Sequence, residues 1–213
     1  MTVWTPVALA RDIETGTASG TTVDGQSVAL WRGTDDAVHA WADRCPHRGM
    51  RLSFGFVRED RLVCLYHGWQ FDGAGACRHV PAHPRMEPPK TVTPHRYRAV
   101  ESAGLVWVAS TDAEGAPDVP DTAITPVRSV WIDGDRDTAF SLLGPDGIDA
   151  GAVVTGTLDG TDVIAGIQTI DAQTTAVHVV AAGVVPAATV NALVLRLHEL
   201  RDSVSPTREV TTA

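Results

Sequence analysis

Long apolar runs are absent from this 213-residue sequence, and its first residues do not look like a secretory leader. No stretch approaches the roughly 20 apolar residues that a membrane-spanning helix needs. The start, MTVWTPVALARDIETG, lacks the basic head and apolar run of a signal peptide. With 44% hydrophobic residues, the chain can still bury one or two cores. We therefore expect a soluble, cytoplasmic globular protein with no membrane partner.

Cysteine and positive charge are also scarce. Three cysteines are an odd number, which fits a disulfide framework poorly and favours metal ligation in a reducing compartment. The formal charge of −9 argues against a nucleic-acid partner, because the phosphate backbone attracts clustered Lys and Arg. Residues 1–110 hold 12 basic and 11 acidic side chains, whereas residues 111–213 hold 5 and 15. We expect two segments with different surfaces.

The first half of the sequence consists of short apolar or alternating runs separated by turn residues. Strands are expected at residues 27–32, 38–41, 61–66, 69–71, 97–101 and 105–109. Gly and Asp between these runs favour tight turns. The pattern predicts a small antiparallel β domain over residues 1–112. Residues 113–126, AEGAPDVPDTAITP, are rich in proline and small side chains and are predicted to form a linker.

The second half combines strands with one helix. Strand-like runs return at residues 128–132, 152–158, 162–170 and 174–182, and Asp159-Gly160 is a hairpin signal between the second and third. The helix expected after Pro186 has one apolar stripe, formed by Val190, Leu193, Val194 and Leu197. We predict a small α+β domain over residues 127–205 and a flexible tail over residues 206–213. The whole chain is expected to be mainly β.

Two cysteines and two histidines carry the predicted chemistry: Cys45 and His47 in CPHRG, and Cys64 and His67 in CLYHGW. Each pair follows an apolar run at a turn, so two turn tips can close on one metal cluster. Thiolates would hold one iron and imidazoles the other, and neutral imidazoles raise the reduction potential above that of an all-cysteine centre. We predict that all four are ligands of a cluster that stores one electron. A structural zinc site of the Cys2His2 type needs the same donors and is the alternative.

The motifs around these four residues resemble the Rieske domain of the Rieske non-heme iron oxygenases. The resemblance runs from Trp4-Thr-Pro-Val through CPHRGMRLSFGFV, LVCLYHGWQFDGAG and HVP to AVESAGLVWV. It implies a Rieske-type [2Fe-2S] cluster held by the four residues, with electrons entering and leaving through the imidazoles. Respiratory Rieske proteins carry an extra cysteine in each loop, where this sequence has Met50 and Tyr66. Trp69 stands where that type has a hydroxyl donor, so we expect a lower potential here.

The resemblance also implies partners. A low potential suits a ferredoxin or a flavin reductase as electron donor. In the family, the Rieske domain is followed by a catalytic domain of helix-grip fold, and electrons cross between the subunits of a ring. A complete oxygenase subunit is therefore a possible acceptor, and a homo- or hetero-oligomer is possible.

The second half departs from the family pattern. There, two closely spaced histidines and one carboxylate hold a mononuclear iron, which leaves open positions for oxygen. This sequence has no histidine between His95 and His178, and only His198 follows. We therefore expect no catalytic residues and a truncated helix-grip-like domain whose iron-bearing helices are deleted between roughly Asp133 and Ala152. His178 and His198 are expected to be packed or surface residues. A solvated turn is expected at Asp133, Asp135 and Asp137.

Other residues near the site are expected to have supporting roles. Cys77 lies outside both loops and is predicted to be a small packed thiol. By the same resemblance, Val80-Pro81 shields the cluster from water, while His79 is a surface residue. Three tryptophans are predicted to be core residues: Trp31, Trp69 and Trp107. Three arginines flank the first loop: Arg44, Arg48 and Arg51. They are either ordinary solvated charges or a docking collar for an acidic electron donor, and we favour the collar because it flanks the imidazoles expected to be exposed.

Three functions follow from these observations. The first is an electron-transfer subunit that passes an electron to a mononuclear iron on a different polypeptide. The second is an oxygenase with its own iron, held by His178, His198 and an Asp. The third is a regulatory or scaffolding homologue whose cluster only stabilises the fold or senses redox state. About two irons per chain would favour the first, and about three the second.

Overall fold

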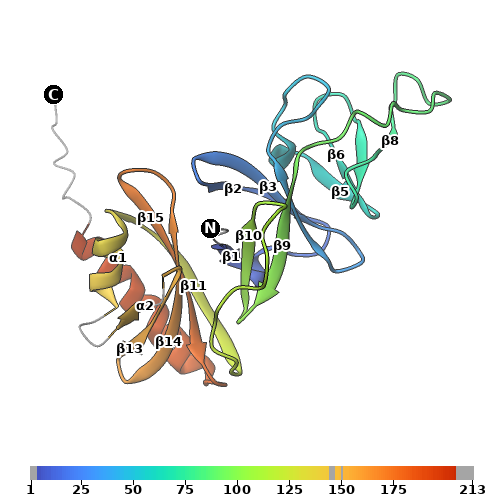
Figure 1. Cartoon of the computed structure of the whole chain (residues 1–213). Helices are drawn as coiled ribbons and strands as arrows, with labels where there is room; N and C mark the ends of the chain where they lie inside the picture. Colours follow the sequence, from blue (N-terminus) through green and yellow to red (C-terminus); the bar gives the residue numbers. More distant parts are fainter. Residues whose placement is uncertain (1–3, 144–146, 150, 205–213) are drawn as a thin grey trace, which may run out of the picture. The chain divides into compact units, whose positions relative to one another are not determined.

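The computed structural model describes residues 4–143, 147–149 and 151–204, and the chain divides into two compact units, residues 1–117 and 118–213 (Figure 1). The strands of both units pair in antiparallel fashion, and the chain is mainly β, as predicted. The predicted tail, residues 206–213, lies outside the described residues. No helix in the described ranges is long and apolar enough to cross a membrane.

The first unit contains two sheets. A six-stranded sheet has the order β1-β10-β9-β4-β3-β2 and a four-stranded sheet the order β5-β6-β7-β8. The strands of the larger sheet are β1 (Thr5–Leu9), β2 (Ala18–Val23), β3 (Gln26–Arg32), β4 (Val38–Ala42), β9 (Arg96–Ser102) and β10 (Leu105–Ala109). Those of the smaller sheet are β5 (Phe56–Arg58), β6 (Arg61–Val63), β7 (Gln70–Asp72) and β8 (Cys77–His79). Two short 3-10 helices complete the unit, η1 (Ala10–Asp12) and η2 (Leu52–Phe54).

Aromatic side chains from both sheets form the core beneath the site. Trp31 of β3 and Trp41 of β4 make an edge contact, with ring centroids 5.0 Å apart, and Trp41 also meets Phe71 of β7. The same buried cluster includes Cys45 and Cys64. The two loops that carry the predicted ligands are therefore anchored on a packed aromatic core.

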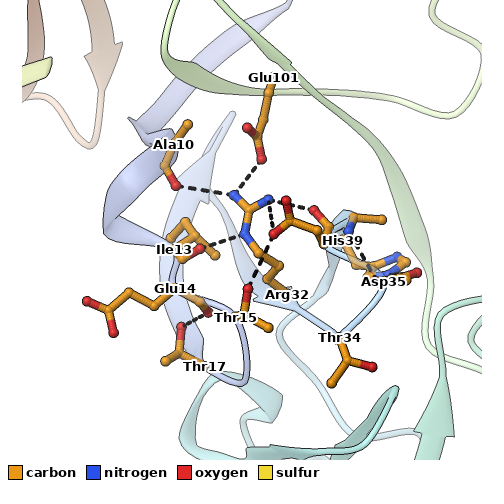
Figure 2. A network of polar contacts seen from close by, with 12 residues as sticks. Ala10, Ile13, Glu14, Thr15, Thr17, Arg32, Thr34, Asp35, His39 and Glu101 are labelled. Atoms are coloured by element: carbon orange, nitrogen blue, oxygen red, sulfur yellow. Dashed lines mark hydrogen bonds and ion pairs between the residues drawn. The ribbon is translucent and has the colours of Figure 1, made fainter. Parts of the chain in front are cut away.

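A buried arginine links separate strands and turns of the larger sheet (Figure 2). Arg32, at the end of β3, is only 5% exposed. Its guanidinium donates to the backbone carbonyls of Ala10, Ile13 and Asp36, and it forms an ion pair with Glu101 of β9. The arginine thus links η1 and the β3–β4 turn to β9.

The second unit is a five-stranded sheet covered by a long helix on one face. Its strand order is β11-β15-β14-β13-β12, formed by β11 (Ile124–Asp133), β12 (Ile148–Asp149), β13 (Val153–Leu158), β14 (Thr161–Thr169) and β15 (Thr174–Ala182). Leu193 and Leu197 of α2 (Ala187–Val204) pack against buried residues of β11 and β15. The predicted hairpin turn joins β13 to β14, with Asp159 and Gly160 both at positive φ.

Two features of this unit differ from the sequence interpretation. Strand β11 begins at Ile124, inside the stretch assigned to the linker. The segment with Asp133, Asp135 and Asp137 is not a simple solvated turn, because the short helix α1 (Arg136–Leu142) begins within it. The carboxylate of Asp135 caps this helix by accepting hydrogen bonds from the amide and the hydroxyl of Thr138.

Candidate metal centre

The two loops that hold the predicted ligands share one backbone design. In each loop the cysteine N–H donates to the carbonyl five residues later, and the cysteine carbonyl accepts from the glycine four residues later. The first loop lies between β4 and η2, and the second between β6 and β7. The hydrogen bonds are Cys45 to Met50 (2.7 Å) and Gly49 to Cys45 (2.8 Å) in the first loop, and Cys64 to Trp69 and Gly68 to Cys64 (both 2.9 Å) in the second. Both glycines have positive φ, 76° and 68°, which glycine adopts without steric cost.

The two thiols lie side by side in the apolar core. Cys45 is 3% exposed and Cys64 is 2% exposed. Burial, together with the neighbouring Cys64 thiol, raises the pKa of Cys45 to about 11, although the backbone N–H groups of His47 and Arg48 act in the opposite direction. A bound cation must therefore displace the thiol protons, and its charge would compensate the buried thiolates.

The two imidazoles form a second pair on the solvent side of the thiols. The ring centroids of His47 and His67 are 4.8 Å apart. His67 is exposed and His47 is half-buried. Burial lowers the pKa of His47, and the nearby charges of His67 and Arg48 lower it further, so its imidazole is neutral at pH 7. Neutral imidazole is the form that binds a metal.

An aromatic ring flanks each imidazole. Trp69 stacks on His47, with centroids 4.3 Å apart and planes within 10°. Tyr66 lies against His67 with centroids 3.8 Å apart, and is 62% exposed. Trp69, predicted to be a core residue, is half-buried: it packs against the buried cluster that contains both cysteines, and its ring also stacks on His47. Trp31 and Trp107 are buried, as predicted.

One orphaned polar atom indicates that a metal group belongs here. Nδ1 of His47 is buried and has no hydrogen-bond partner among the described residues. A buried polar atom of this kind is costly unless something binds it. In the described part of the chain, no three His, Cys, Asp or Glu side chains gather around one single-ion position. The donors instead form one thiol pair and one imidazole pair, which fits a two-iron cluster with a different donor type on each iron.

A proline segment packs against the second loop. A Cβ on Gly68 would lie 3.0 Å from Cγ of Pro81, so the segment after β8 passes directly over this glycine. Val80 is 2% exposed and belongs to the same buried cluster as the two cysteines. This placement supports the shielding role expected for Val80-Pro81. Cys77 is buried nearby with its sulfur 3.8 Å from the carbonyl of His79, as expected of a packed thiol, and burial raises its pKa.

Comparisons with known proteins match the first unit. The family of the Rieske [2Fe-2S] domain matches residues 3–101. The oxidoreductase NdmD of Pseudomonas putida is 34% identical over 148 residues, which are 66% of this chain and 25% of that protein. The oxygenase subunit of 3-chlorobenzoate-3,4-dioxygenase of Comamonas testosteroni is 32% identical over 171 residues, 70% of this chain and 39% of that protein. Residues 3–101 form a Rieske [2Fe-2S] domain, and the homologues of the chain include Rieske non-heme iron oxygenases.

The Rieske domain of this chain takes a Rieske-type [2Fe-2S] cluster. The solved structure of NdmA from Pseudomonas putida CBB5 has the same fold, with a TM-score of 0.73 and 19% identity, over 98% of this chain and 84% of that chain. The segments matched in the two curated relatives are well under half the length of those proteins.

The histidines of the second unit are not brought together as metal ligands within the described residues. His178 of β15 is 1% exposed, and both of its ring nitrogens are engaged, by the hydroxyl of Ser129 (2.8 Å) and by the side-chain oxygen of Gln168 (3.0 Å). Burial lowers its pKa to about 4. His198 is half-buried on α2. The expectation that His178 is a packed histidine agrees with this arrangement.

Proposed function

We propose that this chain is an electron-transfer component of a Rieske-type oxygenase system, with its cluster held by Cys45, His47, Cys64 and His67. In this proposal it passes single electrons to a mononuclear iron on another polypeptide. The observation that carries the proposal is the contrast between the two units. The first unit has paired thiol and imidazole donors, whereas the described part of the second unit gathers no set of metal ligands.

The ligand geometry suits one-electron exchange at the protein surface. The [2Fe-2S] cluster supplies a site that gains or loses one electron. Cys45 and Cys64 would hold the inner iron in the apolar core, where water is excluded. His47 and His67 would hold the outer iron, and the exposed edge of His67 would be the shortest route for an electron between the cluster and a docked partner.

The surface around His67 fits an acidic redox partner. Leu65 and Tyr66, in the second loop, are 57% and 62% exposed. The docking collar of the first loop is also exposed, and Arg51 lies over the ring of Phe54, which is 57% exposed. Apolar side chains surrounded by arginines are typical of docking surfaces. We therefore propose a ferredoxin, or the ferredoxin-like part of a flavin reductase, as the electron donor.

A second candidate function is an oxygenase with its own mononuclear iron. It is favoured by the likeness in fold to NdmA, which extends over 98% of this chain. The buried, fully engaged position of His178 argues against it, because this histidine would have to give up its partners to bind iron.

Iron and acid-labile sulfide analysis of anaerobically purified protein tests the proposal. We expect about two irons and two sulfides per chain, and a Rieske-type electron paramagnetic resonance (EPR) signal after reduction with dithionite. Cys64→Ser should abolish the signal, whereas Cys77→Ser, the matched control, should keep it. A third iron with oxygen-dependent turnover by the chain alone would support the oxygenase instead. Zinc without sulfide would overturn the cluster assignment.

A further inference from the structure

The base of the first ligand loop is closed by a buried carboxylate. Asp43 directly follows β4 and is 7% exposed, and Ser53 lies in η2 and is 9% exposed. One carboxylate oxygen of Asp43 accepts from the backbone N–H of Ser53 at 2.7 Å, and the other accepts from the Ser53 hydroxyl at 2.7 Å. We call this pair the Asp43–Ser53 bridge.

The bridge joins two rigid elements on either side of the ligands. The N–H of Asp43 donates to the carbonyl of Ser27 (2.9 Å), which fixes the carboxylate to the larger sheet. Ser53 lies in η2, whose Leu52 is fully buried in the core that contains both cysteines. Cys45 and His47 lie between these two anchors, so the bridge sets how far apart the ends of their loop are.

The bridge packs against β2 on one side and borders a surface pocket, which Arg51 and Phe54 also line, on another. A Cβ on Gly20 of β2 would lie 3.2 Å from Oγ of Ser53 and 3.8 Å from Oδ2 of Asp43. The backbone of β2 therefore packs directly on the pair. A charged group this deeply buried is costly unless its hydrogen bonds are made, so a loss of the Ser53 donors would displace Asp43 and the loop that follows it.

We infer that Asp43 and Ser53 are positioning residues for the [2Fe-2S] cluster: their bridge holds the Cys45–His47 loop at the separation from the Cys64–His67 loop that the cluster requires. This inference rests on the proposed ligand set. Neither residue touches the iron in this role. Both residues fix the position of Cys45 and His47. Through that position they affect the ligand field of the cluster and the rate at which the cluster is lost.

Two variants of the full-length, cluster-loaded protein test the inference. Ser53→Ala removes the hydroxyl donor and keeps the amide donor, and Asp43→Asn keeps the shape but removes the charge. We expect shifted g-values in the EPR spectrum, a shifted midpoint potential, and about tenfold faster loss of the cluster to an iron chelator, because a buried hydrogen bond to a charged group is broken. If Ser53→Ala does not bind a cluster, the same three properties are measured on Asp43→Asn.

The same domain offers a matched control. Thr34 donates its amide (2.8 Å) and its hydroxyl to the carboxylate of Asp60, which is the same chemistry on the protein surface and outside both ligand loops. Thr34→Ala should leave the spectrum, the potential and the rate of cluster loss unchanged. Variants of Asp43 and Ser53 that lower only the melting temperature, with all three cluster properties as in the wild type, would overturn the inference. A wild-type protein without iron and sulfide would instead refute the proposed function.

Discussion

At the scale of single residues, Arg32 joins several parts of the first unit through hydrogen bonds and an ion pair. Its buried guanidinium is the donor for three backbone carbonyls and the partner of Glu101, whose side chain is 39% exposed (Figure 2). A planar guanidinium can serve several acceptors at once, which a lysine cannot do. Removal of this group would leave buried carbonyls without donors and a carboxylate without its cation.

We therefore predict that Arg32→Met lowers the free energy of unfolding by about 2–3 kcal/mol, because the buried Ile13 carbonyl loses its donor, while the half-exposed ion pair with Glu101 is screened by solvent and adds little. Urea unfolding of the holoprotein, followed by far-UV circular dichroism, measures the change. Arg78→Met is the control: Arg78 is 55% exposed in its ion pair with Asp72, and such pairs contribute at most about 1 kcal/mol. Equal effects of the two substitutions would contradict the interpretation of the buried network.

Among single residues, the sequence predicted the candidate metal ligands best, because metal binding restricts the spacing of the Cys and His side chains. Two Cys/His pairs next to glycines predict two metal-binding turns, and the structure places both pairs in turns of one design. The bridge could not be predicted, because an Asp and a Ser ten positions apart have no spacing rule. Trp69 does pack against the core, but its stacking on His47 is a contact that strand alternation does not reveal.

At the scale of elements, strands β14 and β15 of the second unit match the apolar runs that predict them, whereas the short elements were not predicted. β14 and β15 have nine residues each, so their pattern is easily read. β12 has two residues and α1 has seven, too few for a period to appear. The run expected to be a strand to Tyr66 ends at Val63, because Cys64 begins the hydrogen-bonded turn of the second loop.

Three strands of this unit meet at a buried neutral histidine. Ser129 is on β11, His178 on β15 and Gln168 on β14, so the two hydrogen bonds of His178 cross the central strands of the sheet. The arrangement suits the neutral ring, whose Nε2–H donates to Gln168 while Nδ1 accepts from the Ser129 hydroxyl. A protonated ring would have two donors, and the hydroxyl would have to turn.

This histidine should make the stability of the chain depend on pH in one window. The pKa of His178 is about 4 in the folded state, below the ordinary histidine value of 6.5, so the unfolded state takes up the proton first as pH falls. The free energy of unfolding should therefore be unaffected by His178 above about pH 6.5, decrease by about 3 kcal/mol between pH 6.5 and pH 4, and then level off.

Denaturant unfolding across that pH range, compared between wild type and His178→Gln, isolates the contribution of this histidine. The variant should lose about 3 kcal/mol less than the wild type on acidification, whatever its stability at neutral pH. His198→Gln, on α2, is the control and should track the wild type. Parallel pH curves for His178→Gln and the wild type would show that His178 does not stay neutral in the folded state.

At the scale of the whole molecule, the charge is divided between the two halves of the chain. Residues 1–110 carry nearly balanced charge, and residues 111–213 carry a net charge of −10. The docking collar therefore provides local positive charge on a protein with an overall charge of −9. We expect these arginines to supply the local attraction for an acidic donor, because the net charge of the molecule repels it.

We predict that reduction of the cluster by an acidic ferredoxin slows as ionic strength rises, and that the double variant Arg44→Glu, Arg48→Glu is reduced about tenfold more slowly at low salt. Stopped-flow absorbance of the oxidised cluster measures the rate. Because exposed charges are screened within about 10 Å at 0.1 M salt, the difference should nearly vanish at about 0.5 M.

Arg11→Glu is the control for this prediction. It makes a charge change of the same sign on η1, outside the ligand loops, and should have a much smaller effect on the rate of reduction. If it slows reduction as strongly as the collar variant does, net charge rather than the collar governs the encounter, and the donor does not dock at the imidazole side of the Rieske domain.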